Sequence, residues 1–258
     1  MRISIIGAGR VAYHLAHALS AQHEIVQIYS RTLDKAQQLA DQFKAQAIAQ
    51  PENLNQDIDL MIIAVSDQSI AEVIRQVYFY LQDVLIVHTS GSSHLNVLAD
   101  VHAKSGVFYP LQTFSLEREI DWENTPLFIE ASEPTDQEIL THLANSLSKR
   151  VYQYSSDQRL SLHLAAVFAC NFSNYCYDMA KQIVDAQQVD FSLLYPLILE
   201  TANKATKNDP RQGQTGPAMR GDQNILNMHQ QMLEQSERQD LADVYKLFSQ
   251  QILERHKS

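Results

Sequence analysis

The stretch RISIIGAGRVA, residues 2–12, decides the fold of this 258-residue chain. A short β-branched run leads directly into a segment in which Gly7, Gly9 and Ala12 follow the spacing G-x-G-x-x-[G/A]. The first glycine allows a tight turn, the second lets the backbone approach a pyrophosphate, and the small third residue permits close helix–strand packing. The stretch therefore predicts a strand, a turn and a helix whose N-terminus faces a dinucleotide. A glycine turn kept only for packing is the alternative.

The rest of the first half alternates apolar runs with amphipathic ones. Strands are expected at 2–7, 24–30, 58–66, 83–91, 106–110, 126–131 and 150–154, and helices at 10–21, 33–43, 69–81 and 136–148. Continuous apolar strands separated by helices indicate a parallel sheet covered on both faces. We therefore predict an α/β, Rossmann-type, mostly parallel sheet as a dinucleotide-binding domain over residues 1–155.

Beyond residue 156 the sequence contains no convincing strand. Helices are expected at 157–187, 191–207, 222–236 and 238–255. This pattern predicts that an all-α helical domain, residues 156–258, follows the sheet. Its long apolar helices need more cover than four helices provide, so we expect a homodimer formed through this domain.

A stiff, charged segment interrupts the helical half at TGPAMRGD, residues 215–222. We expect a rigid loop whose path is fixed by Gly216 and Pro217. Arg220 would then face an anionic group of a substrate or a phosphate. Asp222 would either orient Arg220 or cap the next helix.

Charge and composition exclude several classes of function. Thirty acidic and 20 basic residues give a net charge of −10, which disfavours binding to nucleic acid or to an anionic membrane. No apolar run reaches the ~18–20 residues of a membrane span, and the N-terminus continues into a strand rather than a signal peptide. Cys170 and Cys176 lack a zinc spacing, so no metal is expected. We therefore expect a cytoplasmic protein that binds a small molecule.

The end of the second strand indicates which dinucleotide is bound. An NAD site usually carries Asp or Glu there to bond the ribose 2′-OH, whereas this chain has Ser30, Arg31 and Thr32. A guanidinium between two hydroxyls matches a 2′-phosphate, so we expect NADP, with NAD less favoured. Arg31 as a solvated surface cation is the alternative. The predicted cofactor-binding residues are Gly7, Gly9, Arg10, Val11, Ser30, Arg31, Thr32, Ala64, Val65 and Ser66.

Two polar loops, HTSGS (88–92) and FYPLQTFS (108–115), follow neighbouring predicted strands. Ligands of such folds lie beyond the carboxyl ends of the strands, so these loops predict a small polar ligand. A helix cap with a turn is the alternative for HTSGS. Together with positions from the helical half, the predicted substrate-binding residues are Ser90, Gly91, Ser92, Gln112, Asn174 and Arg220.

The long helix expected at 157–187 carries His163, Asn171 and Asn174 on a mostly apolar surface. At the regular helical spacing these three residues share one face, and buried polar groups need partners. Hydrogen bonds between helices would satisfy them. The other interpretation is catalysis, with His163 as the first candidate for proton transfer, His88 as the second, and Asn171 beside them.

These motifs together resemble a two-domain family. It is described as a Rossmann-like, NADP-oxidoreductase-type domain followed by a C-terminal domain of unknown function, and the resemblance covers essentially the whole chain. More distantly the chain is similar to 6-phosphogluconate dehydrogenase, β-hydroxyacid dehydrogenases and pyrroline-5-carboxylate reductase. In those relatives the helical domain helps to form the active site and often the dimer. The resemblance therefore implies a nicotinamide-dependent oxidoreductase, but it implies no particular substrate.

One departure from the dehydrogenase relatives affects the chemistry. Their long helix supplies a catalytic Lys four residues before an Asn that matches Asn171, but that Lys position is Val167 here and a Glu position is Asn174. The expected function is an NADP(H)-dependent oxidoreductase acting on a small polar, anionic carbonyl, imine or hydroxyl compound in a cleft between the two domains. A nucleotide-binding sensor or regulatory dimer without turnover is the alternative. A third interpretation replaces nicotinamide with a deazaflavin coenzyme.

Overall fold

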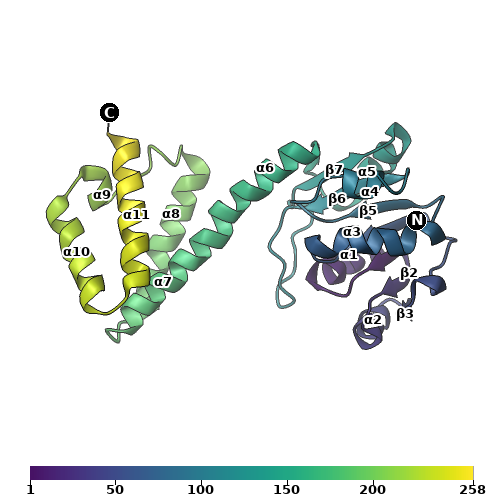
Figure 1. Cartoon of the computed structure of the whole chain (residues 1–258), viewed down its shortest axis with the longest axis horizontal. Helices are drawn as coiled ribbons and strands as arrows, with labels where there is room; N and C mark the ends of the chain where they lie inside the picture. Colours follow the sequence, from purple (N-terminus) through teal and green to yellow (C-terminus); the bar gives the residue numbers. More distant parts are fainter. Residues whose placement is uncertain (258) are drawn as a thin grey trace. The chain divides into compact units, whose positions relative to one another are not determined.

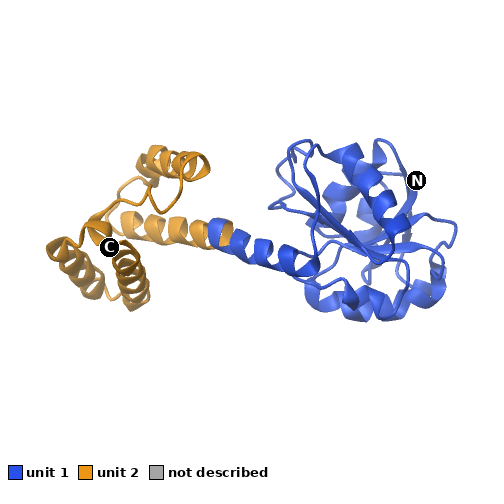
Figure 2. Cartoon of the chain, turned by 90° about the horizontal axis from the view of Figure 1, so that it is seen from above, with its two compact units in different colours: residues 1–169 blue, residues 170–258 orange. Residues whose placement is uncertain are grey.

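A computed structural model describes residues 1–257 of the chain (Figure 1). It consists of two compact units, Met1–Ala169 and Cys170–Ser258 (Figure 2). Sequence analysis placed the division earlier, at residues 155/156. In the structure the division comes later, after Ala169, because the helix that follows the sheet is anchored to the sheet by the buried Arg159, described below.

The first unit contains one eight-stranded sheet in the order β3-β2-β1-β4-β5-β6-β7-β8. All neighbouring pairs are parallel except β6 and β7, so the predicted Rossmann-type, mostly parallel sheet is confirmed. The strands are β1 (Arg2–Ile6), β2 (Glu24–Tyr29), β3 (Gln46–Ile48), β4 (Leu60–Ile63), β5 (Leu85–His88), β6 (Ser105–Pro110), β7 (Leu127–Ala131) and β8 (Val151–Gln153). Sequence analysis missed β3, which is only three residues long. The strand order reverses between β1 and β4, where ligands of this architecture bind.

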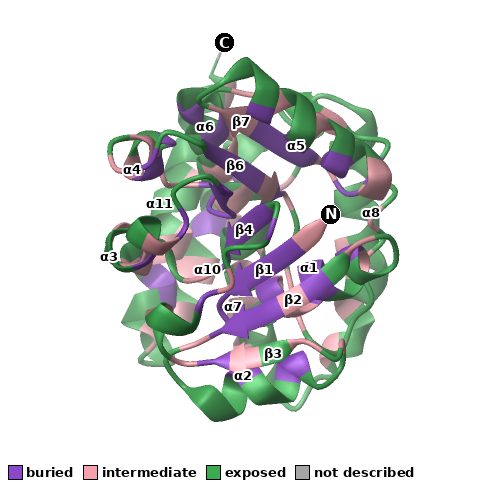
Figure 3. Cartoon of the chain, turned by 90° about the vertical axis from the view of Figure 1, so that its right-hand side faces the viewer, coloured by how far each residue is buried: buried purple, intermediate pink, exposed green. Residues whose placement is uncertain are grey.

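Helices cover both faces of this sheet. They are α1 (Arg10–Ser20), α2 (Leu33–Ala40), α3 (Asp67–Val77), the short α4 (Asn96–Ala99) and α5 (Pro134–Leu147). Successive strand residues point to opposite faces. Ile5 therefore packs into one core with α1, α2 and α5, and Ile6 packs into the other with α3. Figure 3 shows the central strands in the colour of buried residues.

The helical part of the chain contains an irregularity that the sequence did not predict. Its elements are α6 (Ser156–Ala166), a π-helix (Val167–Phe172), α7 (Ser173–Asp185), α8 (Tyr195–Lys207), α9 (Pro217–Arg220), α10 (Gln223–Gln235) and α11 (Gln239–His256). The expected single helix 157–187 is therefore interrupted. A π turn holds one extra residue, which rotates the following side chains by about 100°. The angles between His163, Asn171 and Asn174 therefore differ from those of a regular helix, and their shared face stays a prediction.

The TGPAMRGD segment forms a one-turn helix, α9, rather than the loop expected from sequence. Gly216 and Gly221 flank it with φ values of +105° and +68°, which glycine adopts without strain. Pro217 occupies the first turn, where its missing N–H costs nothing. The Asp222 carboxylate accepts a hydrogen bond from the Ile225 N–H at 3.4 Å and so caps α10.

Candidate functional site

The glycine turn after β1 has two glycines with different requirements. Gly7 has φ +115°, and a Cβ there would lie 2.2 Å from the Ala64 carbonyl oxygen, so the fold itself demands glycine. At Gly9 a Cβ would meet no protein atom within 4 Å, and φ is −91°. Nothing in the protein requires glycine at this position. Its bare backbone faces open space, as it must where a ligand approaches closely.

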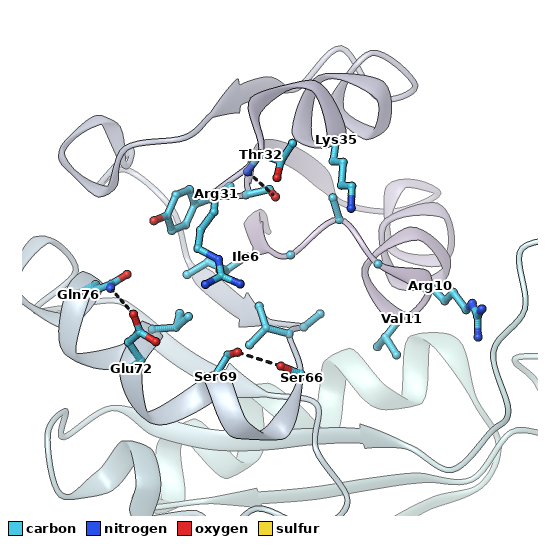
Figure 4. Close-up of a pocket in the computed structure, with 18 residues that line it drawn as sticks. Ile6, Arg10, Val11, Arg31, Thr32, Lys35, Ser66, Ser69, Glu72 and Gln76 are labelled. Carbon is cyan, nitrogen blue, oxygen red and sulfur yellow. Dashed lines mark hydrogen bonds between the residues drawn. The ribbon is translucent and has the colours of Figure 1, made fainter. Parts of the chain in front are cut away.

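A cavity of about 540 Å³ opens at this turn, beyond the carboxyl ends of β1, β2 and β4 (Figure 4). Its size is within the usual range of ligand pockets. All ten predicted cofactor-binding residues line it, from the glycine turn, the end of β2 and the end of β4. The structure thus brings these residues together in one pocket. Their role in binding stays a prediction.

Positive charge collects at the β2 side of this pocket. Figure 4 shows the Arg31 guanidinium extending into the cavity, and Lys35 also lines it. Ser30 and Thr32 flank Arg31, and the Thr32 N–H donates to Ser30 Oγ at 3.3 Å. Lys35, in the first turn of α2, was not among the predicted residues, because Arg31 lies before that helix and no helical spacing joins the two. Sequence analysis also missed Glu72 of α3, which lines the pocket.

The N-terminus of α1 fits an anionic ligand. Its Gly9 N-cap provides no side-chain hydrogen bond, and its first turn holds no acidic residue. The first N–H groups of a helix lack intrahelical partners and carry the positive end of the helix dipole. With Arg10 as the first helical residue, the end of α1 can therefore accept phosphate oxygens.

The HTSGS loop is organised mainly by its own hydrogen bonds. Ser90 Oγ accepts the N–H groups of Ser92 and Ser93, at 3.1 and 2.9 Å. Ser92 Oγ donates to the carboxylate of Asp67 in the first turn of α3. In the other loop, Gln112 is exposed and its amide oxygen accepts the Thr113 N–H at 2.8 Å. Both predicted loops are thus preorganised polar turns at the ends of strands.

His88 is fully buried at the end of β5. Its Nδ1 accepts the Ser90 N–H at 3.1 Å, which places the proton of the neutral ring on Nε2. Burial, assisted by the positive charge of Arg159, lowers the pKa of His88 from 6.5 to about 3. An imidazole held neutral in this way is poorly suited to donate a proton, so the geometry argues against His88 in that role.

His163 of α6 contacts Tyr109 of β6. Its Nδ1 lies 3.2 Å from the Tyr109 hydroxyl, and both side chains are partly exposed. The backbone of Gly91 lies directly against this pair, since a Cβ at that position would be 2.7 Å from His163 Nδ1. The structure thus joins two predicted residues, His163 and Gly91, to a tyrosine that the sequence did not single out.

A buried charge cluster holds the HTSGS loop to the last strands. Arg159 of α6 is 1% exposed and forms an ion pair with Glu130 of β7 at 2.6 Å. It also donates to the Ser93 carbonyl oxygen at 2.6 Å. Ser156 Oγ donates to Glu130 and accepts the Leu95 N–H, at 2.7 and 2.9 Å. Sequence analysis missed this cluster, because no local pattern joins residues so far apart.

The remaining predicted residues belong to the helical unit. Asn171 and Asn174 lie in the π-helix and in α7, Arg220 ends α9, and all three are exposed. Their roles stay predictions. Among residues 1–257, no helix is long and apolar enough to cross a membrane.

Comparisons with known proteins agree with this architecture. Residues 2–91 match the family described as NADP oxidoreductase, coenzyme F420-dependent, and residues 125–252 match a domain of unknown function, DUF2520. No protein of curated function matches the chain.

Three solved structures are similar over nearly the whole length. A proposed NADP oxidoreductase from Bacteroides fragilis is 40% identical, with 98% of each chain covered and a TM-score of 0.91. An imine reductase from Myxococcus stipitatus in complex with NADP+ is 14% identical, covering 98% of this chain and 94% of its own, with a TM-score of 0.73. A pyrroline carboxylate reductase from Plasmodium falciparum with NADP bound is 13% identical, covering 100% and 98%, with a TM-score of 0.56.

The last two similarities concern the fold alone, whereas 40% identity over 98% of both chains establishes a family. The resemblance inferred from the sequence motifs is thereby confirmed. The chain belongs to the two-domain family in which an N-terminal domain of the NADP oxidoreductase, coenzyme F420-dependent, type precedes a C-terminal DUF2520 domain.

Proposed function

We propose that this protein is an NADP(H)-dependent oxidoreductase that acts on a small polar, anionic compound with a carbonyl, imine or hydroxyl group. The observation that carries the proposal is the pocket at the glycine turn, where Gly9 has no structural reason to be glycine and Arg31 and Lys35 supply positive charge. The Bacteroides relative of proposed NADP oxidoreductase function supports it.

Each part of the pocket has a proposed role toward the dinucleotide. The pyrophosphate lies against the backbone from Gly9 to Val11, at the N-terminus of α1. Arg31 and Lys35 hold the ribose 2′-phosphate, with hydroxyls from Ser30 and Thr32 beside them. When bound, the nicotinamide supplies a hydride to the substrate or accepts one from it.

The substrate side of the proposal rests on the polar loop after β5 and on His163. Hydride transfer to a carbonyl or imine leaves negative charge on the heteroatom, so a proton must be delivered there. His163 lies against Gly91 of the HTSGS loop and is a suitable source. Arg220, Asn171 and Asn174 of the helical unit stay proposed substrate-binding residues.

The test is NADPH oxidation by the purified protein against a panel of small keto acids, aldehydes and cyclic imines. Oxidation that depends on one member of the panel supports the enzyme. Tight NADPH binding without turnover across the panel would favour the sensor instead. A deazaflavin absorbance band in the copurified protein would favour the coenzyme named in the family description.

We also propose that the helical unit pairs with a second copy of the chain. Within residues 170–257 only four apolar side chains are buried: Ala218, Leu226, Leu241 and Ala242. Large apolar side chains are exposed instead on every main helix of the unit, among them Tyr175, Ile183, Leu197, Leu199, Met228, Met232, Leu247 and Phe248. An apolar surface of this extent marks an association site. Self-association would give the unit the core that it lacks alone.

A further inference from the structure

Tyr109 lies near the carboxyl end of β6, on the same side of the sheet as the nucleotide pocket. Val107 pairs with His88 at the carboxyl end of β5, and Tyr109 follows two residues later. The carboxyl ends of β1, β4 and β5 lie on this same side because the three strands are parallel. The phenol therefore stands beside the HTSGS loop, on the rim where a ligand of this fold binds.

The contact between Tyr109 and His163 requires a glycine at position 91 of the HTSGS loop. Its backbone is not in the left-handed region, so conformation alone does not require glycine. Space does: a Cβ would lie 2.6 Å from Tyr109 Cζ, and 2.7 Å from both Tyr109 Oη and His163 Nδ1. Any other residue would push the two side chains from their positions.

The phenol is held in its protonated form. Burial raises the pKa of Tyr109 to about 12, the negative charge of Asp67 adds to the effect, and Arg159 opposes it. Near neutral pH the hydroxyl is therefore protonated, and because burial disfavours the phenolate, a proton given to the substrate must be replaced at once from His163. The imidazole beside it can relay a proton, because each of its two ring nitrogens can donate or accept a hydrogen bond.

We propose that Tyr109 is the catalytic residue that gives the proton to the substrate, and that His163 supplies it through the Oη···Nδ1 contact. The inference rests on the proposed function. As the substrate carbon receives a hydride from NADPH, the electron pair of the C=O or C=N bond moves to the heteroatom. The Tyr109 O–H bond breaks as the new O–H or N–H bond forms. The Nδ1 proton of the His163 imidazolium then restores the phenol, and the neutral imidazole regains a proton from solvent.

This assignment gives the proposed site a proton donor without a lysine on the long helix. The resemblance to dehydrogenases implies a lysine at the position where this chain has Val167, and His88 is buried with its pKa near 3. Tyr109 and His163 are both partly exposed, so substrate and solvent can reach the pair. The opposite reaction, alcohol or amine oxidation, uses the same contacts in the reverse order.

The experiment compares Tyr109→Phe and His163→Asn with wild type, using NADPH and the best compound of the panel. Tyr152→Phe is the matched control, because Tyr152 belongs to the neighbouring aromatic cluster and stacks on Phe128. We expect Tyr109→Phe to lower kcat by about 10²- to 10⁴-fold, the usual loss of a general acid, while the Kd of NADPH changes less than about twofold. His163→Asn should lower kcat less than Tyr109→Phe does, and kcat should depend less on pH than in wild type. Tyr152→Phe should leave kcat within about twofold of wild type.

A second measurement follows the formation of the Tyr109 phenolate by ultraviolet difference titration against Tyr109→Phe, without substrate. We expect the pH at which the Tyr109 phenolate forms to change in His163→Asn. The proton-donor role would be overturned if Tyr109→Phe kept more than about half of the wild-type kcat, or if the phenolate titration were the same in His163→Asn and wild type. Either result would leave the proposed function standing. Wild type that binds NADPH but reduces nothing in the panel would overturn the proposed function, and the proton-donor role with it.

Discussion

Arg159 Nη1 lies 2.6 Å from Glu130 Oε2, in an ion pair that joins α6 to β7. The same guanidinium donates to the Ser93 carbonyl oxygen at 2.6 Å, so one buried side chain fixes both the backbone directly after the HTSGS loop and the helix that carries His163. The relative position of loop and helix determines whether Tyr109 and His163 meet over Gly91. The ion pair is therefore a positioning element for the proposed site.

Removing one partner of this pair should destabilise the first unit strongly. Arg159→Met leaves the Glu130 carboxylate without its buried partner, which typically costs about 3–5 kcal/mol of unfolding free energy. The exposed Lys149–Glu123 pair provides the matched control. Lys149→Met should leave the free energy of unfolding close to that of wild type, because exposed ion pairs contribute little. Urea denaturation measures both values, and equal losses for the two variants would contradict the role assigned to Arg159.

The two glycines of the turn should respond in opposite ways. Gly7→Ala places a methyl group against the Ala64 carbonyl at an unfavourable φ, so we expect lower stability and weaker expression. Gly9→Ala meets no protein atom, so the melting temperature should remain within a few degrees of wild type. Its methyl group would occupy space required by the pyrophosphate, and NADPH affinity should fall at least about tenfold. Unchanged affinity in a folded Gly9→Ala protein would mean that no phosphate approaches there.

His88 should make the protein less stable in acid. Its pKa is about 3 in the folded state and near 6.5 when unfolded, so the unfolded state binds more protons between these values. Stability conferred by the neutral ring is complete above about pH 6.5 and falls by up to about 1.4 kcal/mol per pH unit below it. His88→Asn keeps an acceptor for the Ser90 N–H but does not titrate. The difference in unfolding free energy between wild type and His88→Asn should therefore shrink as the pH falls toward 5. A difference independent of pH would show that His88 titrates normally.

The exposed apolar surface of the helical unit should hold the proposed dimer together. Leu197 and Leu199 of α8 are each 63% exposed. Replacing both with Lys should weaken self-association by about 100-fold or more, because a buried charge without a partner is costly. Gln38→Lys, on α2 of the first unit, adds one charge to an exposed polar position outside the helical unit and should leave the dimer intact. Light scattering across a dilution series gives the oligomeric state, and a folded, monomeric wild type would contradict this part of the proposal.

The parts of the structure that sequence could predict are those encoded locally. The glycine turn, the buried strands and the hydroxyl–Arg31–hydroxyl segment each lie within a few residues, and spacing alone indicated them. The contact between Arg159 and Glu130 spans 29 residues, and Arg159 sits in an otherwise ordinary polar helix start. Tyr109 could not be singled out from the sequence for the same reason, because its position is explained only by Gly91, which lies against it in the structure. The π turn has no spacing signature, so the angles between side chains on the long helix could not be predicted from regular spacing.

The central claim is that the pocket at the glycine turn binds NADP(H) and recognises its 2′-phosphate. Calorimetric titration of wild type and Arg31→Ala with NADPH and NADH tests it most directly. The account predicts that wild type binds NADPH more tightly than NADH, and that Arg31→Ala loses about 10- to 100-fold in NADPH affinity while NADH affinity is unchanged, as for a lost charge-assisted hydrogen bond. Wild type that binds neither nucleotide, or an Arg31→Ala protein that keeps the full preference for NADPH, would contradict it.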